Sequence, residues 1–211
     1  MPNQAAAVTL CPRLISSKQP NGSKPEDICL ACGLCCDGVI FSDVRLQAED
    51  NPEPFARLEA LPAEATASSK GRPLVPQSSA RASFAVGKKA SQMPQPCVAF
   101  DGCRCRIYNQ RPKHCREFEC LLLRSVRAGR TEKAHALEII RKARRRGDRV
   151  WRLLRALGDL DEERSLSVRF RRTVKRLEGS QLDEPTAELY GELTLAVHDL
   201  NCVLSSAFYP G

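Results

Sequence analysis

The sequence predicts an α+β protein that is mostly α-helical, in which a small cysteine-rich module of short strands and loops packs against a C-terminal set of about four helices. Three observations support this prediction. Nine of the eleven cysteines fall in two short stretches, residues 29–36 and 97–120. Apolar residues of the second half recur at helical spacing. An apolar content of 42% is enough for a core in a chain of 211 residues.

Composition divides the chain into three parts. Residues 1–26 hold four prolines and are predicted to be a disordered tail. Residues 27–125 form the cysteine-rich domain, in which residues 62–96, rich in Ser, Ala and Pro, are expected to be a flexible loop or insertion. Residues 126–211 form a helical extension. No stretch approaches the roughly 20 apolar residues of a membrane span, and the start lacks a signal-peptide core, so a cytoplasmic protein without a membrane partner is expected.

Short elements are expected around the first cysteine stretch. Val39–Phe41 is predicted to be a strand, extended or partnered by Val44–Leu46. A short helix is predicted over residues 47–60, and a further strand over residues 84–86.

The spacing of apolar residues in the second half of the chain predicts long helices over residues 111–129, 131–157, 161–177 and 184–204. In the second of these, Thr131 is the expected N-cap and Gly147 a point of kinking or breakage. Its apolar stripe consists of Ala136, Ile140, Ala143, Val150, Leu154 and Leu157. Cys202, in the last helix, is interpreted as a small core residue.

The clustering of the cysteines favours metal binding over a disulfide framework. The number of cysteines is odd, and no secretion signal is present. Thiolates packed this densely repel one another, and a soft cation relieves the repulsion. Cys35 and Cys36 are adjacent, so their side chains are expected to point in different directions, towards two ions or towards one ion and the core.

The cysteines form one ordered motif, Cys29-x-x-Cys32-x-x-Cys35-Cys36, followed by Cys105-Arg-Ile-Tyr-x-x-Arg111-Pro112-x-x-Cys115-Arg116-x-Phe118-x-Cys120. This motif resembles the YkgJ-type cysteine-cluster family, whose shared segment is the CxxCxxCC zinc/iron-chelating domain. The resemblance covers residues 27–125 and implies metal binding, with Cys103 an alternative ligand to Cys105. The eight cysteines that match the family are Cys29, Cys32, Cys35, Cys36, Cys97, Cys105, Cys115 and Cys120.

Two metal centres fit these sulfurs. The C-x-x-C-x-x-C spacing is shared with ferredoxin-type iron–sulfur proteins, in which a fourth cysteine comes from elsewhere in the chain. Eight thiolates also suit two zinc sites of four cysteines each, although zinc ribbons use two C-x-x-C pairs and the second stretch has none. An iron–sulfur cluster is therefore slightly favoured over zinc.

The residues around the cysteines predict supporting roles. Tyr108 and Phe118 are expected to pack around the site and exclude water, while His114 is interpreted as a surface histidine rather than a ligand. Cationic side chains are placed to offset thiolate charge: Arg104, Arg106, Arg111, Lys113 and Arg116.

Two other classes of function remain as alternatives. The net charge of +8 and a basic stripe of Arg141, Arg145, Arg149 and Arg152 suit a nucleic-acid-binding module with structural zinc, but a solvated helix face is favoured because no DNA-binding fold signature accompanies the charge. A cluster-assisted redox or methyl-transfer enzyme is the other alternative. The sequence assigns no catalytic residue and no partner protein, and the motifs of nucleotide binding and hydrolysis are missing from it.

Overall fold

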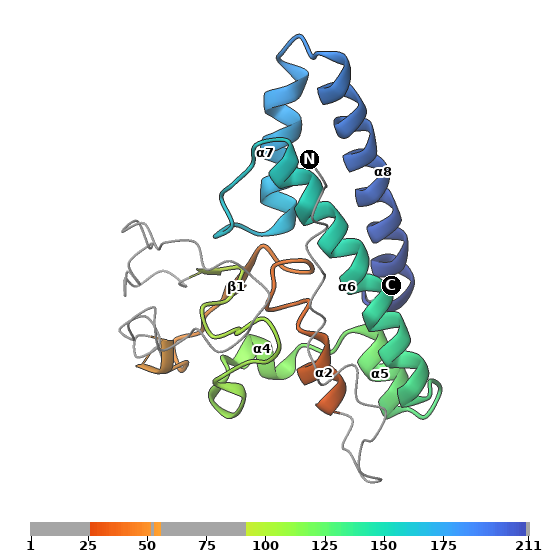
Figure 1. Ribbon diagram of the computed structural model, residues 1–211. Coiled ribbons are helices and arrows are strands. Elements are labelled where there is room, and N and C mark those ends of the chain that lie inside the picture. Colours follow the sequence, from red (N-terminus) through yellow and green to blue (C-terminus); the bar gives the residue numbers. More distant parts are fainter. Residues whose placement is uncertain (1–25, 52, 56–91, 210–211) are drawn as a thin grey trace.

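The computed structural model describes residues 26–51, 53–55 and 92–209. Figure 1 shows the long helices α6, α7 and α8 on one side and the short elements α2, α4 and β1 gathered on the other. In chain order the elements are α2 (Glu26–Cys32), β1 (Asp43–Arg45), β2 (Gln92–Pro94), the 3-10 helix η2 (Tyr108–Gln110), α4 (Lys113–Glu117), α5 (Leu121–Arg127), α6 (Lys133–Ala156), α7 (Leu166–Glu178) and α8 (Glu184–Ala207). The predicted α+β, mostly α-helical class is confirmed.

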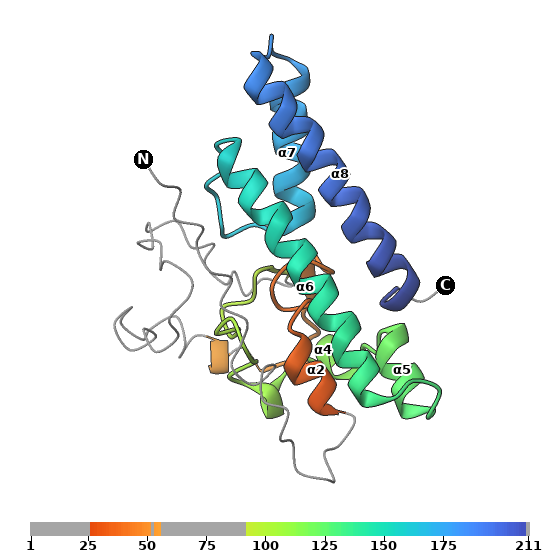
Figure 2. The same cartoon turned by 45° about the vertical axis from the view of Figure 1, so that its right-hand side comes forward.

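Helix α6 is the centre of the larger hydrophobic core. The predicted apolar stripe is confirmed, because each of its six residues, from Ala136 to Leu157, is buried. Helix α8 runs back alongside α6 in the opposite direction and contributes Leu193, Val197 and Leu200 to the same core (Figure 2). Full burial of one such aliphatic side chain stabilises the fold by about 1.5–3 kcal/mol.

The first cysteine stretch shares this larger core. Ile28, Leu34 and Val39 are buried against the helices, and α2 packs on α6. The cysteine-rich and helical parts of the chain are therefore joined by apolar contacts, and the domain boundary expected at residue 125 stays a prediction.

A smaller second core lies beneath the two strands. β1 and β2 pair antiparallel, with Val44 opposite Met93. Both side chains are buried together with those of Leu46, Phe55 and Ala99. The partly buried Cys97, Cys105 and Cys115 pack against this second core.

A buried ion pair fastens the end of α6 to α7. The Asp159 carboxylate accepts hydrogen bonds from Arg169 Nε at 2.8 Å and from Arg172 Nη2 at 2.7 Å. Arg169 is 0% exposed, and its guanidinium lies 5.0 Å from the centre of the Trp151 ring. Burial acts to raise the pKa of Asp159, but hydrogen bonds and charge from the two arginines outweigh it and lower that pKa.

Four local predictions are wrong. Val39–Phe41 is not a strand, because the backbone N–H groups of Val39 and Ile40 both donate to Leu34 O in a turn, and β1 begins at Asp43. The helix expected over residues 111–129 is divided into α4 and α5, since Phe118 and Cys120 have extended backbones. Glu132 rather than Thr131 precedes α6. Helix α6 continues through Gly147, which is buried opposite Val39.

Other predictions are only partly covered by the described residues. In the helix expected over residues 47–60, residues 47–51 are not helical and residues 53–55 are. The strand expected at residues 84–86, most of the loop over 62–96, and residues 1–25 of the tail lie outside the described residues. Glu26, assigned to the tail, is the first residue of α2.

Replacing Asp159 with Ala should lower the free energy of unfolding by about 3–5 kcal/mol, because Arg169 would be left as a buried charge without its carboxylate. Asp161→Ala is the matched control. Asp161 also pairs with Arg172, but it is 36% exposed, so its loss should cost about 0–1 kcal/mol. Urea unfolding of both variants measures the difference, and equal losses would contradict the assignment.

Candidate metal centre

The two cysteine stretches come together around one apolar cavity. The backbone N–H of Cys97 donates to Cys36 O at 2.8 Å, which joins the stretches directly. The cavity has a volume of about 60 Å³. Six of the eight predicted site cysteines line it: Cys29, Cys35, Cys36, Cys97, Cys105 and Cys115.

A glycine turn positions the first stretch. Cys29 and Cys32 lie on α2, and Gly33 ends this helix with a φ of +67°, in the left-handed region that favours glycine. A Cβ atom at Gly33 would also lie 2.5 Å from Cζ of Phe100, which belongs to the second stretch. Glycine at this position therefore allows both the turn and the close approach of the second stretch.

The second stretch is held by short elements. An antiparallel bridge pairs Phe100 with Cys105, and Cys115 lies on α4. The Asp50 carboxylate, from the segment that follows β1, accepts from Lys113 N at 2.7 Å at the start of α4. Cys120 precedes α5, and its sulfur accepts a hydrogen bond from Leu123 N at 3.4 Å.

Three cysteines of the two stretches do not line the cavity. Cys32 and Cys120 pack instead against the larger core. Cys103 is half-buried in the turn of Asp101, whose carboxylate accepts from Cys103 N at 2.9 Å. The ten described cysteines form no disulfide with one another.

Aromatic side chains close the site. Tyr108 and Phe118 line the cavity, as the sequence predicts, together with Phe41 and Phe100. His114 is half-buried rather than fully on the surface. Its ring lies 5.4 Å from that of Phe41, and its buried Nε2 has no hydrogen-bond partner among the described residues. The surface prediction fails because Phe41, distant in the sequence, covers this ring.

Burial raises the pKa of all eight predicted site thiols, furthest for Cys35 and Cys36, to about 12 for Cys32 and Cys97, and to about 11 for Cys115. Neighbouring thiols raise the pKa of most of them further, because a second negative charge nearby is unfavourable. The thiols are therefore protonated at neutral pH in the metal-free protein, and a metal ion must displace their protons.

Cys35 and Cys36 are adjacent in the chain, but the thiols that raise their pKa values are largely different. The pKa of Cys35 is raised by burial first and then by the thiols of Cys32, Cys29, Cys36 and Cys120. The pKa of Cys36 is raised by burial first and then by those of Cys97, Cys105, Cys29 and Cys115. Cys35 and Cys36 thus have largely different neighbours, as expected for adjacent side chains that point in different directions.

Arg111 is the predicted cation that lies closest to the thiols. Its guanidinium stacks 3.6 Å from the centre of the Tyr108 ring, and Nε donates to Tyr108 O at 2.8 Å. Its charge opposes the burial that raises the pKa of Cys29. Of the other predicted cations, Lys113 pairs with Glu49, and the remaining three are exposed: Arg104, Arg106 and Arg116.

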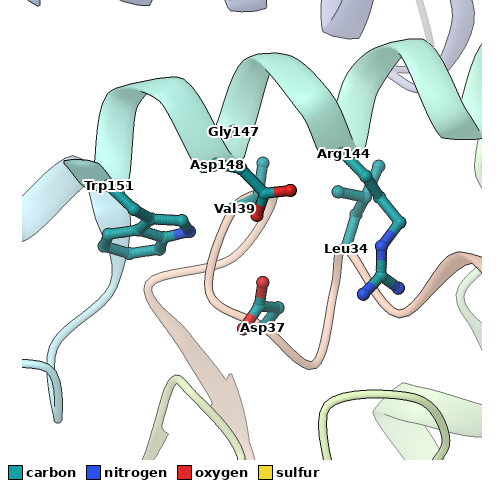
Figure 3. Close-up of a pocket in the computed structure, with 7 residues that line it drawn as sticks. All are labelled: Leu34, Asp37, Val39, Arg144, Gly147, Asp148 and Trp151. Carbon is teal, nitrogen blue, oxygen red and sulfur yellow. The ribbon is translucent and has the colours of Figure 1, made fainter. Parts of the chain in front are cut away.

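The sequence singled out no role for Arg144, which joins the helical half to both cysteine stretches. It extends from α6 beside Leu34 (Figure 3). Its guanidinium donates to Cys32 O at 2.9 Å and to Gly102 O at 3.0 Å. Arg144 stands within a run of basic residues, so nothing local in the sequence distinguishes it.

The predicted basic stripe lies on the outer face of α6. Arg145, Arg149 and Arg152 are exposed, and Arg141 is half-buried. Arg149 lies 3.7 Å from the Glu192 carboxylate of α8.

Cys202, expected in the core, is instead exposed on α8, where its sulfur lies 3.6 Å from His198 Nε2. The prediction fails because it rested on the general tendency of cysteine to be buried, whereas Cys202 lies on the side of α8 away from the buried Leu200.

Two features are absent from the described residues. No group of three or more His, Cys, Asp or Glu side chains there has the arrangement of a preformed metal site. No helix in the same residues is both long and apolar enough to cross a membrane.

Clustered, buried cysteines on a small module supported by helices define the metal-chelating class of protein. The model of the CxxCxxCC family, described as a "putative zinc- or iron-chelating domain", matches residues 28–138. This match spans more than half of the chain, and the protein belongs to that family. No curated protein and no solved structure matches the chain.

Replacing Arg144 with Gln should destabilise the fold by about 1.5–3 kcal/mol, because hydrogen bonds from a charged group to two backbone carbonyls are lost. Arg145→Gln, at the exposed neighbouring position, should change stability by less than about 0.5 kcal/mol. Urea unfolding of both variants tests this. Similar losses in the two variants would contradict the role of Arg144.

Raised thiol pKa values predict how stability depends on pH. The folded, metal-free protein holds thiol protons more tightly than the unfolded chain. Stability should therefore be complete below the ordinary thiol pKa of 9.0 and decrease as the pH rises towards 12. Melting temperatures across this range measure the loss, and Cys97→Ser should make it smaller. A profile unchanged by that substitution would contradict the prediction.

Proposed function

We propose that this protein is a cytoplasmic metal-binding protein whose eight clustered cysteines hold an iron–sulfur cluster or zinc. The convergence of six of these cysteines on one buried apolar cavity carries the proposal. A reducing compartment keeps such thiols available as ligands, which is the reason for placing the protein in the cytoplasm.

The residues around the cavity fit such a group chemically. Thiolates are ligands for zinc and for iron–sulfur clusters. An apolar surround limits access of water, and Arg111 supplies positive charge near Cys29. The sulfurs would have to turn towards a common centre on binding, since no preformed group of ligands is present among the described residues.

The eight cysteines divide into two candidate sets of four. The first set is Cys29, Cys32, Cys35 and Cys120, and it combines the C-x-x-C-x-x-C motif with a distant fourth cysteine. Three observations support it: α2 packs on α5, Cys32 and Cys120 lie against the larger core, and the thiols of Cys29 and Cys120 raise the pKa of Cys32 after burial has done so. This set suits an iron–sulfur cluster, which we favour over zinc for it.

The second set is Cys36, Cys97, Cys105 and Cys115. The last three pack against the smaller core, and Cys97 is hydrogen-bonded to the backbone of Cys36. Cys29 lies between the two sets, because its thiol also acts on Cys36 and Cys115. Four thiolates without a position for water would make a zinc ion here structural rather than catalytic.

Elemental analysis and an absorption spectrum of protein purified without oxygen test the proposal. Iron with acid-labile sulfide and a visible band that reductant bleaches would support a cluster, whereas zinc without visible absorption would support structural zinc ions. Protein that retains neither metal when both are supplied during expression would contradict the proposed function.

Serine variants test the division of the cysteines. Cys120→Ser and Cys97→Ser should each remove the metal of one set and leave that of the other in place, since four ligands are needed for each centre. Melting temperature should fall with the metal, because metal binding contributes to folding. Cys202→Ser is the control and should change neither quantity. Complete loss of metal from both site variants would favour a single shared centre.

A further inference from the structure

Gln95 is a buried polar residue whose side chain has no hydrogen-bond partner within residues 26–51, 53–55 and 92–209. Its side chain is 1% exposed, and neither Nε2 nor Oε1 forms a hydrogen bond with any described residue. The backbone is fixed, because Gln95 N donates to Ser42 O at 3.1 Å. A buried amide that has lost its water and gained no partner is unfavourable, so such a group calls for an explanation.

The surroundings of Gln95 indicate what could become its partner. Gln95 follows β2 and lines the same cavity as the cysteines. Cys97 is two residues away, and its backbone is hydrogen-bonded to Cys36, which lines the cavity as well. On the strand side, the neighbouring lining residues are apolar, namely Val44, Phe55 and Met93. The sulfurs of Cys97, two residues along the chain, and of Cys36, hydrogen-bonded to it, are therefore the candidate acceptors for the amide.

The strength of that hydrogen bond depends on whether metal is present. A protonated thiol is a weak acceptor, whereas a thiolate carries negative charge and accepts strongly. Metal binding converts the cysteines from thiols to thiolates. The amide of Gln95 would thus gain its partner only when the centre is loaded.

We propose that Gln95 is a positioning residue of the metal centre, and that its Nε2 donates a hydrogen bond to a metal-bound thiolate of Cys36 or Cys97. This inference rests on the proposed function. Groups that donate to ligands in this way typically change metal affinity by about 10–100-fold when they are removed.

Gln95→Leu should stabilise the metal-free protein but weaken its retention of metal. The substitution removes a buried, unpartnered amide, so the metal-free protein should melt at a higher temperature than the parent. It also removes the donor, so the loaded protein should transfer its metal to a chelator about ten-fold faster. A purely structural role for Gln95 would instead lower the melting temperature of the metal-free protein while weakening its hold on the metal.

Met93→Leu is the matched control, because Met93 lines the same cavity from β2 and offers no hydrogen-bond donor. It should leave the rate of metal transfer unchanged. If Gln95→Leu does not fold, Gln95→Met, which keeps the length of the side chain, undergoes the same two measurements. Failure of both variants to fold would itself overturn the proposal, since it would make Gln95 essential without metal.

The outcomes separate this inference from the proposed function. A parent protein that binds neither iron nor zinc overturns both. A parent that binds metal, with Gln95→Leu releasing it at the parental rate, overturns the role of Gln95 alone. Faster release combined with a higher melting temperature of the metal-free variant supports it.

Discussion

The packing of α6 against the first cysteine stretch is the contact on which the rest of the structure depends. The elements in and around the cysteine stretches are short, with strands of three residues and helices of five to seven. Such short elements are not stable alone. Ile28, Leu34 and Val39 are buried with the apolar stripe of α6. Cys32 and Cys120 pack against that shared core.

The cavity combines two requirements that oppose each other in a metal-free protein. Thiols must be close together to share an ion, yet closeness and burial make their negative form unfavourable. The protein meets both requirements by keeping the thiols neutral. A metal ion with two or more positive charges favours the thiolate form when it binds. Arg111 is near enough to favour the thiolate form of Cys29, but burial outweighs its charge.

The sequence predicted the fold class and the buried stripe of α6 because both depend on periodicity, which is a local property. It also predicted that Tyr108 and Phe118 would enclose the site. It failed where long-range contacts decide the outcome. Arg144 is one of several adjacent arginines and differs from Arg145 only in facing Cys32 and Gly102. Gln95 carries no motif, and only its burial beside the cysteines distinguishes it. The break between α4 and α5 follows from extended backbone at Phe118 and Cys120, which propensity does not indicate.

The exposure of Cys202 has a consequence for handling the protein. Among the ten described cysteines it is the one on the surface, at the outer side of a regular 24-residue helix. Air oxidation reaches an exposed thiol before a buried one. Two copies joined through Cys202 would therefore form a covalent dimer during storage, with the buried thiols still reduced, and its apparent mass would be an artefact of oxidation rather than a property of the native protein.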